Sequence, residues 1–280
     1  MTLLLHTSSA QGSLAEHLAQ AEAQVRQSPG QRDARWGLIE LLCMAGQWER
    51  VDRHLRSFSQ LFEDSERSVT HLSSLLDGER QRADVGAALA MPLPLAAAPT
   101  WMDDLAQALH CNARGDPEGA DALRLSALER AHCPSGRCRF ETAGGPSREQ
   151  SFEWLADTDS RFGPVLELIL QGDYHWLPFE SIICLTLRAP QRLCDLVWSP
   201  VVLRYRDAQG TDQLIQAHVP ARYPGTSDEC GEALLLGRLS RWQDVGLSGV
   251  FGLGQRCWMS EAAEWPQLDV RQIDFGNRAP

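Results

Sequence analysis

The chain changes character once along its length, and this change constrains the fold more than any other feature of the sequence. Before residues 152–180, Ala, Leu and Gln dominate and apolar residues recur at helical spacing. After them, β-branched and aromatic residues dominate and are interrupted by Pro and Gly. The sequence therefore predicts an α+β protein, in which an N-terminal helical array is joined to a C-terminal β-rich region built as an antiparallel sheet or a small barrel.

Length and charge narrow the classes of function. With 280 residues, 43% of them hydrophobic, the chain is long enough for two cores, since a domain usually takes about 100 to 200 residues. The net charge of -11 repels phosphate backbones and disfavours nucleic acid as a partner. All 26 basic residues are arginine, and the absence of lysine excludes a P-loop, a Schiff base and a lysine general base. These features favour protein partners.

Cysteines and apolar tracts indicate the compartment. The eight cysteines include no CxxC pair, which is typical of a reducing, cytosolic setting. Residues 1–5 form an apolar run without a basic flank, too short for the core of a secretion signal. The apolar tract at residues 87–99 is interrupted by Pro92 and Pro94 and falls short of the roughly 20 residues that span a bilayer. It is interpreted as a flexible connector or as a buried extended segment, and we expect a cytoplasmic protein without membrane insertion.

A spacing of 34 residues recurs in the helical part. Gly12 is followed by Leu14, and Gly46 is followed by Trp48, 34 residues further along the chain. This is the tetratricopeptide period, in which a glycine ends one helix and a large residue two positions later opens the next. Gly115 continues the pattern at one residue more than two further periods. The spacing predicts tetratricopeptide-like helical hairpins.

Helical hairpins of this kind are expected over residues 1–132. A degenerate repeat without glycine is expected near residues 79–80, and an irregular helical bundle is the alternative, because short periodic matches are common. Stacked hairpins present a concave surface that receives a segment of another protein, and they carry no catalytic chemistry.

Residues 133–150 are rich in Gly, Ser, Pro and Arg and show no periodicity, so they are expected to form a linker. Cys133 and Cys138 supply only half of a zinc site, and no metal or cofactor is predicted. The C-terminal region then covers residues 151–280, with a hairpin turn expected at residues 207–210. Strands are expected at residues 174–179, 182–187, 196–205, 213–219, 250–259 and 268–275.

Three acids cluster at the start of this region: Glu153, Asp157 and Asp159. They could serve an enzyme or a divalent metal, but a structural role is favoured. Arg161 lies within reach of either aspartate for an ion pair that fixes a local turn. A helix is expected over residues 164–171, with the acids just upstream of its positive end. No nucleophile elbow, zinc-protease helix or complete phosphate-binding glycine pattern occurs, so we expect no catalytic residues and no enzyme activity.

Several motifs of the C-terminal half occur together and in a distinctive order. They are FEWLADTDSRFGPVLE, YHWLPFE, DLVWSP, RYPG, GLGQR and LDVRQIDF. With them, the chain resembles the ImpE or TagJ family of type VI secretion accessory proteins, and LLCMAGQWERVDRHL resembles the second helical hairpin of that family. The chain departs from the family in lacking lysine and in its Ala/Pro-rich stretch at residues 87–99.

The resemblance implies a cytoplasmic, non-enzymatic protein associated with the contractile sheath of a bacterial secretion machine. It implies binding to the N-terminal helix of the small, TssB-like sheath subunit and a link to the ClpV-type AAA+ ATPase that recycles contracted sheath. An amphipathic helix would then lay its apolar face into a groove of this protein. Because aromatic residues and arginine dominate protein-binding hot spots, the expected groove residues are Trp154, Tyr174, Trp176, Phe179, Trp198, Arg222 and Tyr223.

Two other hypotheses remain open. An unrelated enzyme would have two of the clustered carboxylates exposed in one pocket with perturbed pKa values. A generic tetratricopeptide scaffold would bind a chain terminus in its helical concavity and use the β-rich region only as a cap. Substitutions on the concave face would abolish binding by the scaffold, whereas the adaptor would lose more from substitutions of the aromatic residues in the C-terminal half.

Overall fold

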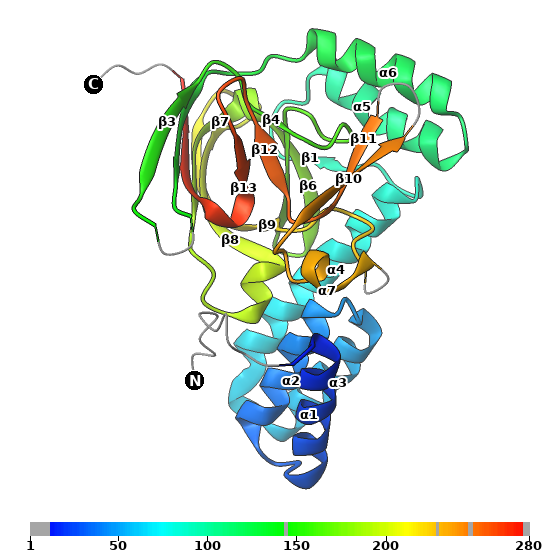
Figure 1. Cartoon of the computed structure of the whole chain (residues 1–280), viewed down its shortest axis with the longest axis vertical. Coiled ribbons are helices and arrows are strands. Elements are labelled where there is room, and N and C mark those ends of the chain that lie inside the picture. The colour runs from blue at the N-terminus through cyan, green and yellow to red at the C-terminus, as the bar shows by residue number, and fades with distance from the viewer. Residues whose placement is uncertain (1–11, 143–144, 228–229, 246–248, 277–280) are drawn as a thin grey trace.

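The computed structural model describes residues 12–142, 145–227, 230–245 and 249–276. The apolar run at residues 1–5 lies outside these ranges. Within them the chain forms helices up to residue 130 and mainly strands from residue 136 onward (Figure 1). The predicted α+β fold, with helices first and a β-rich region after them, is confirmed.

Successive helices pack against one another along the first half of the chain. They are α1 (Leu14–Gln27), α2 (Arg32–Met44), α3 (Trp48–Leu61), α4 (Glu66–Gly86), α5 (Thr100–Ala113) and α6 (Pro117–Arg130). Ser13 begins α1 with a reciprocal pair of bonds, because its hydroxyl accepts the N–H of Glu16 while the Glu16 carboxylate accepts the N–H of Ser13. Gly46 separates α2 from α3 with a φ of 67°, which glycine adopts without strain. The predicted helical hairpins are present.

Helix α4 differs from the expected repeat. No turn interrupts it near residues 79–80, and it runs unbroken for 21 residues. Gly78 lies so close to the sheet that a Cβ atom there would stand 2.4 Å from Cγ2 of Ile169. Packing of α4 directly on a strand therefore replaces the stacking of a further helical hairpin.

Most of the described strands join a nine-stranded sheet that curls around a core (Figure 1). Its order is β1-β6-β5-β9-β8-β7-β14-β2-β3, and neighbouring strands are antiparallel except for β1 with β6. The strands are β1 (Leu93–Pro94), β2 (Gly136–Phe140), β3 (Arg148–Phe152), β5 (Val165–Leu170), β6 (Asp173–Pro178), β7 (Ile182–Leu187), β8 (Trp198–Arg206), β9 (Asp212–Pro220) and β14 (Val270–Phe275).

Shorter elements complete the β-rich region. A three-stranded sheet has the order β13-β12-β4, and β10 pairs with β11 as an antiparallel hairpin. These elements are β4 (Ala156–Asp157), β10 (Ser240–Val245), β11 (Gly249–Gly254), β12 (Cys257–Met259), β13 (Glu264–Pro266) and the one-turn helix α7 (Glu232–Leu235). The region is thus larger and more elaborate than a small sheet or barrel.

Two expectations for the region after the helices are wrong. Residues 133–150, expected to be a linker, contain β2 and the beginning of β3. Residues 164–171, expected to be a helix, contain β5, whose sequence VLELIL is buried on both faces of the sheet. Gln171 and Gly172, both with positive φ, form the hairpin turn into β6. Burial between two layers therefore decides the conformation of this short apolar run.

The apolar tract at residues 87–99 follows the edge of the sheet. Its central part is β1, which pairs in parallel with β6. Ala96 is buried in the core of the sheet, whereas Leu89 is 77% exposed. The tract is therefore an extended, mostly exposed segment paired with the sheet, which is neither the flexible connector nor the buried segment that the sequence left open. None of the helices in the described ranges is long and apolar enough to cross a membrane.

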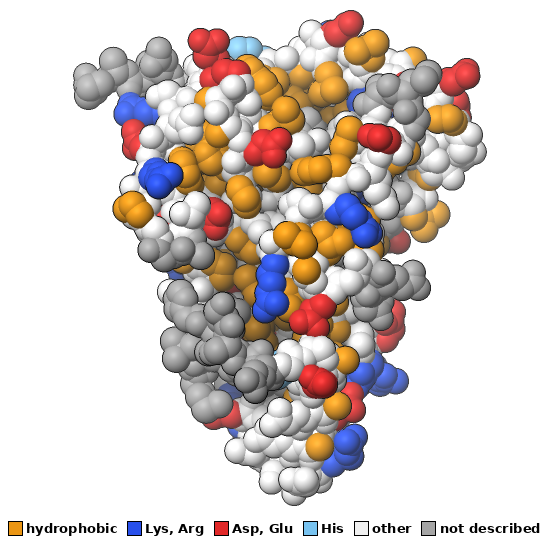
Figure 2. Space-filling view, in the orientation of Figure 1, with side chains coloured by type: hydrophobic (Ala, Val, Ile, Leu, Met, Phe, Trp, Pro, Cys, Tyr) orange, Lys and Arg blue, Asp and Glu red, His pale blue; other side chains and the backbone are white. Residues whose placement is uncertain are grey.

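The two faces of the large sheet serve separate cores. The inner face encloses a cluster that includes Trp258 and Trp265 from the smaller sheet. On the other face, called here the helix face, Trp198 and Ile169 pack with α2, α3 and α4, and Trp176 packs with α5. Figure 2 shows hydrophobic side chains reaching the surface mainly over the β-rich part of the molecule in this view, with few on the tip formed by the first helices. The helices and the sheet are thus joined by two apolar clusters on the helix face.

Candidate binding pocket between the helices and the sheet

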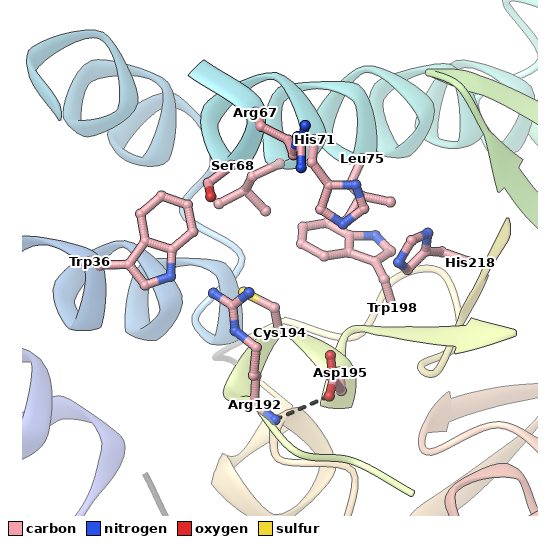
Figure 3. Close-up of a pocket in the computed structure, with 11 residues that line it drawn as sticks. Trp36, Arg67, Ser68, His71, Leu75, Arg192, Cys194, Asp195, Trp198 and His218 are labelled. Carbon is pink, nitrogen blue, oxygen red and sulfur yellow. Dashed lines mark hydrogen bonds between the residues drawn. The ribbon is translucent and has the colours of Figure 1, made fainter. Parts of the chain in front are cut away.

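A pocket of about 360 Å³ opens where the helices meet the helix face of the sheet (Figure 3). Helices α2 and α4 form one side, and the other side comes from β8, β9 and the 3-10 turn η3 (Leu193–Leu196). We call it the junction pocket. Its lining consists chiefly of Trp36, Arg67, His71, Leu72, Leu75, Arg192, Trp198 and His218.

The floor of the junction pocket is apolar and fixed in place. Leu72 and Leu75 of α4 and Trp198 of β8 are 3%, 4% and 1% exposed. The indole Nε1 of Trp198 donates to Oε2 of Glu79 at 3.1 Å, and its ring packs against that of Trp48 with centroids 5.5 Å apart. A floor held in this way offers a preformed apolar surface to one side chain of a ligand.

The wall formed by Trp36 carries a paired arginine. The guanidinium of Arg192 lies over the indole, 5.5 Å from its centroid, and its Nε donates to Oε1 of Glu40 at 2.8 Å. The indole N–H of Trp36 donates to the same carboxylate oxygen at 3.0 Å. Because Glu40 is only 6% exposed, it needs this positive partner, and the charge of Arg192 belongs to the fold.

Two histidines of the lining contact each other. The rings of His71 from α4 and His218 from β9 lie with centroids 5.0 Å apart. Burial lowers the pKa of both, and that of His218 falls to about 4, with a further lowering by His71. Both imidazoles are therefore neutral near neutral pH. Arg67, one turn before His71, is exposed on the rim and forms no ion pair with any residue in the described ranges.

The structure places most of the predicted groove residues in the interior. Trp154 is half-buried. The other six are no more than 6% exposed, namely Tyr174, Trp176, Phe179, Trp198, Arg222 and Tyr223. They form no exposed aromatic groove in this conformation, because the two cores of the large sheet require these large side chains. Of the six, Trp198 lines the junction pocket.

The predicted turn around Asp157 and Asp159 is held by arginine. Arg161 donates from Nε to Oδ1 of Asp159 at 2.9 Å, which is the expected ion pair. Asp157 instead accepts from Nη1 of Arg256 at 2.5 Å and from the hydroxyl of Tyr223 at 2.8 Å. Burial raises the pKa of Asp157 to about 6, while Arg256 acts in the opposite direction.

The clustered acids do not form an exposed carboxylate pair. Asp157 and Asp159 are 3% and 0% exposed and are bonded to arginines, whereas Glu153 lies on the surface. Residues 12–142, 145–227, 230–245 and 249–276 contain no group of three or more His, Cys, Asp or Glu side chains that could hold a metal ion. The arrangement required by the enzyme hypothesis is thus not formed by these acids.

A second set of buried charges joins the helices to the sheet. Arg82 of α4 donates to the two carboxylate oxygens of Glu167 at 2.8 and 3.0 Å, and its Nη2 also donates to the carbonyl oxygen of Arg222 at 2.9 Å. Arg222 donates in turn to the carbonyl oxygens of Met44 and Leu235 at 2.8 and 2.7 Å. These bonds connect α4 to β5 and join α2, α4 and α7 to the segment that follows β9, so they fix the helices relative to the β-rich region.

Sequence reasoning missed Trp36, His71, Arg192 and His218 as residues of one site. Trp36 falls on the apolar stripe of its helix, a position that predicts a core residue. An isolated histidine gives no sequence signal for a binding site. The signal that could have pointed to the site is the motif DLVWSP, because it contains Trp198 and follows Arg192 closely.

Comparisons with known proteins agree with this architecture. The family model described as ImpE protein matches residues 149–274. The type VI secretion system accessory component TagJ of Pseudomonas aeruginosa strain PAO1 is 36% identical over 264 residues, which cover 94% of this chain and 88% of the relative. The crystal structure of protein VPA1032 from Vibrio parahaemolyticus matches with a TM-score of 0.82 at 25% identity, covering 95% of this chain and 94% of that one. The chain therefore belongs to the ImpE/TagJ family of type VI secretion system accessory components.

Proposed function

We propose that this protein is a non-enzymatic adaptor of the type VI secretion system that binds the amphipathic N-terminal helix of the small sheath subunit at the junction pocket. The observation that carries the proposal is the preformed apolar floor of Leu72, Leu75 and Trp198, open between the helices and the sheet. Family membership supports the assignment to this secretion system, since the relative from P. aeruginosa is named as an accessory component of it.

The sheet surface beside the pocket extends the apolar floor. In the pairing of β8 with β9, Pro200 stands opposite His218 and Arg204 stands opposite Leu214. Because side chains alternate along a strand, Pro200, Val202 and Leu214 share the helix face with His218, and Leu214 is 72% exposed. We call these three residues the β8–β9 strip. A helix that places one apolar residue in the pocket can lay the next residue of the same stripe on this strip, since positions three or four apart share a face.

The proposal has a second step, in which the adaptor links the sheath subunit to the ClpV-type AAA+ ATPase. This step rests on the family resemblance. It requires a protein that lies in the cytoplasm and binds other proteins. The net charge of -11 supports the absence of a nucleic-acid partner, because it repels phosphate backbones.

Calorimetric titration with a synthetic peptide of the cognate small sheath subunit's N-terminal helix tests the proposal. We expect saturable binding of the native peptide, with a Kd between about micromolar and nanomolar. A version whose apolar face is replaced by serine should not bind, because burial of that face drives the association. Equal binding of the two versions contradicts the helix-in-groove mechanism, and binding of neither points to the ATPase as the direct partner.

A further inference from the structure

The rim of the junction pocket carries one charged arginine without an ion-pair partner in the described ranges, Arg67, and two imidazoles that are neutral near neutral pH. Arg67 and His71 lie one turn apart on α4 (Figure 3), the helix that also supplies the floor residues Leu72 and Leu75. His218 faces them from β9, with its ring centroid 5.0 Å from that of His71. Within the described ranges, Arg67 has no ion-pair partner and neither imidazole forms an ion pair, although the Asp195 carboxylate is near enough to act on the pKa of His71.

The other charged groups of the pocket are occupied by the fold itself. Arg192 donates to the buried Glu40 at 2.8 Å. The carboxylate of Asp195 accepts the backbone N–H groups of Gln191 and Arg192 at 2.8 and 3.0 Å. Arg67 is therefore the arginine of this lining that is left for a ligand. An apolar floor beneath a basic rim is complementary to an apolar side chain accompanied by a carboxylate.

We propose that the junction pocket recognises an acidic residue beside the apolar anchor, so that its ligand is an amphipathic helix with Asp or Glu one turn from the residue that enters the pocket. This inference rests on the proposed function, whose partner it specifies. The carboxylate binds the guanidinium of Arg67 and the imidazole of His71, while the anchor packs on the floor. A helix with a neutral or basic residue at that position loses this contact, so the pocket selects among amphipathic helices by charge.

Protonation of His71 strengthens the same contact. In the free protein, burial and Arg192 lower the pKa of His71 while Asp195 acts in the opposite direction, and the ring of His218 lies against that of His71. Arg67 lines the same pocket. A bound carboxylate raises this pKa because it favours the imidazolium. A ligand that raises a pKa binds more tightly as the pH falls, so the affinity for an acidic helix rises from about pH 7.5 to about pH 5.5.

The test is calorimetric titration of the full chain with the N-terminal peptide of the cognate small sheath subunit in two forms. One form is native, and the other has each Asp and Glu replaced by Asn or Gln. We expect the neutral form to bind about tenfold more weakly, as is usual for the loss of a charge-assisted contact. Arg67→Gln should remove most of this difference. Arg56→Gln, at an exposed position of α3, is the matched control and should preserve it.

The outcomes separate this inference from the proposed function. Equal, saturable binding of the native and neutral peptides leaves the proposed function standing and overturns the selection by charge. Binding of neither form overturns both. As a second readout, the wild-type protein should bind the native peptide about threefold more tightly at about pH 5.5 than at about pH 7.5, which corresponds to a pKa change of less than one unit. His71→Gln should lose this dependence, and its persistence in the variant would exclude His71 as a receptor of the carboxylate.

Discussion

The buried charges of the helix–sheet junction and the charges on the rim of the junction pocket use arginine in opposite ways. Arg82 and Arg256 are 5% and 0% exposed and are paired with the buried carboxylates of Glu167 and Asp157. Arg67 is exposed and has no ion-pair partner in the described ranges. A buried ion must be satisfied by the fold, whereas water solvates a rim charge until a ligand arrives. In a chain whose basic residues are all arginine, burial and pairing separate the residues that the fold requires from those that remain available to a ligand.

Of the substitutions considered, removal of a buried charge should have the largest effect on stability. Glu167→Gln removes the carboxylate that pairs with Arg82, so we expect the free energy of unfolding to fall by about 3 to 5 kcal/mol. Urea unfolding followed by tryptophan fluorescence measures the loss. Glu149→Gln is the matched control, because Glu149 pairs with Arg137 at the surface with side chains 55% and 50% exposed. A control of this kind should lose about 0 to 1 kcal/mol, and a loss no larger for Glu167→Gln would refute the distinction.

The second largest effect should come from blocking the junction pocket with a large side chain. Ser68 is exposed on α4 and lines the junction pocket, so the indole of Ser68→Trp occupies the space expected for the anchor. We expect the affinity for the native sheath peptide to fall about thirtyfold, or ~2 kcal/mol. Thr70→Trp is the control, because Thr70 is exposed on the same helix and lines a different groove. Unchanged affinity in both variants would favour the generic scaffold, and equal losses would indicate damage to α4.

His218 combines features of the two regions, because it is largely buried and yet unpaired with a carboxylate. Its pKa in the folded protein is about 4, lowered by burial from 6.5. Below pH 6.5, His218 is protonated in the unfolded chain but stays neutral in the folded protein. Stability therefore falls as the pH drops toward 4. We expect a loss of roughly 1 to 2 kcal/mol between about pH 7.5 and about pH 5. His218→Gln should reduce this loss in urea unfolding, while His132→Gln, at an exposed position, should retain it.

The smallest effect should come from the β8–β9 strip. Leu214→Ser shortens an apolar side chain that is 72% exposed and stays solvated in the free protein. We expect stability to change little and the Kd for the native peptide to rise about threefold to fivefold, since only part of one side chain loses its contact. Leu61→Ser, at a position of α3 that is 50% exposed, serves as the control for calorimetry. Identical Kd values for both variants would show that the bound helix does not reach the strip.

Features that depend on a few adjacent residues could be predicted from the sequence. Gly46 ends α2, and the N–H of Gly210 donates to the carbonyl of Asp207 at 2.9 Å in the turn between β8 and β9. Strand β5 could not be predicted in this way, because a six-residue apolar run is strand or helix according to what covers its two faces. The unbroken length of helix α4 could not be predicted either, because it depends on the close packing of Gly78 on Ile169 and not on a local stop signal.

The junction pocket could not be predicted from the sequence. Trp36, His71 and His218 are far apart along the chain and meet only through tertiary packing. Aromatic composition did not separate a binding surface from a core, because both use large amphipathic side chains. Trp176 and Tyr223 accordingly fill the interior, although their motifs pointed to the correct family. Pairing between residues far apart in the sequence cannot be predicted in this way either, and it is such pairing that distinguishes Arg67 from Arg82 and Arg256.

Arg222 has a mechanical consequence. Its guanidinium holds the last carbonyl oxygens of α2 and α7, and its own carbonyl oxygen accepts from Arg82 of α4. A pulling force on a helix bound in the junction pocket would therefore pass from the helices to the segment that follows β9 through short, directional bonds to a charged group. Such bonds stretch very little before they break, so a force applied to one half of the protein would reach the other half through a stiff coupling and would not be absorbed in a linker.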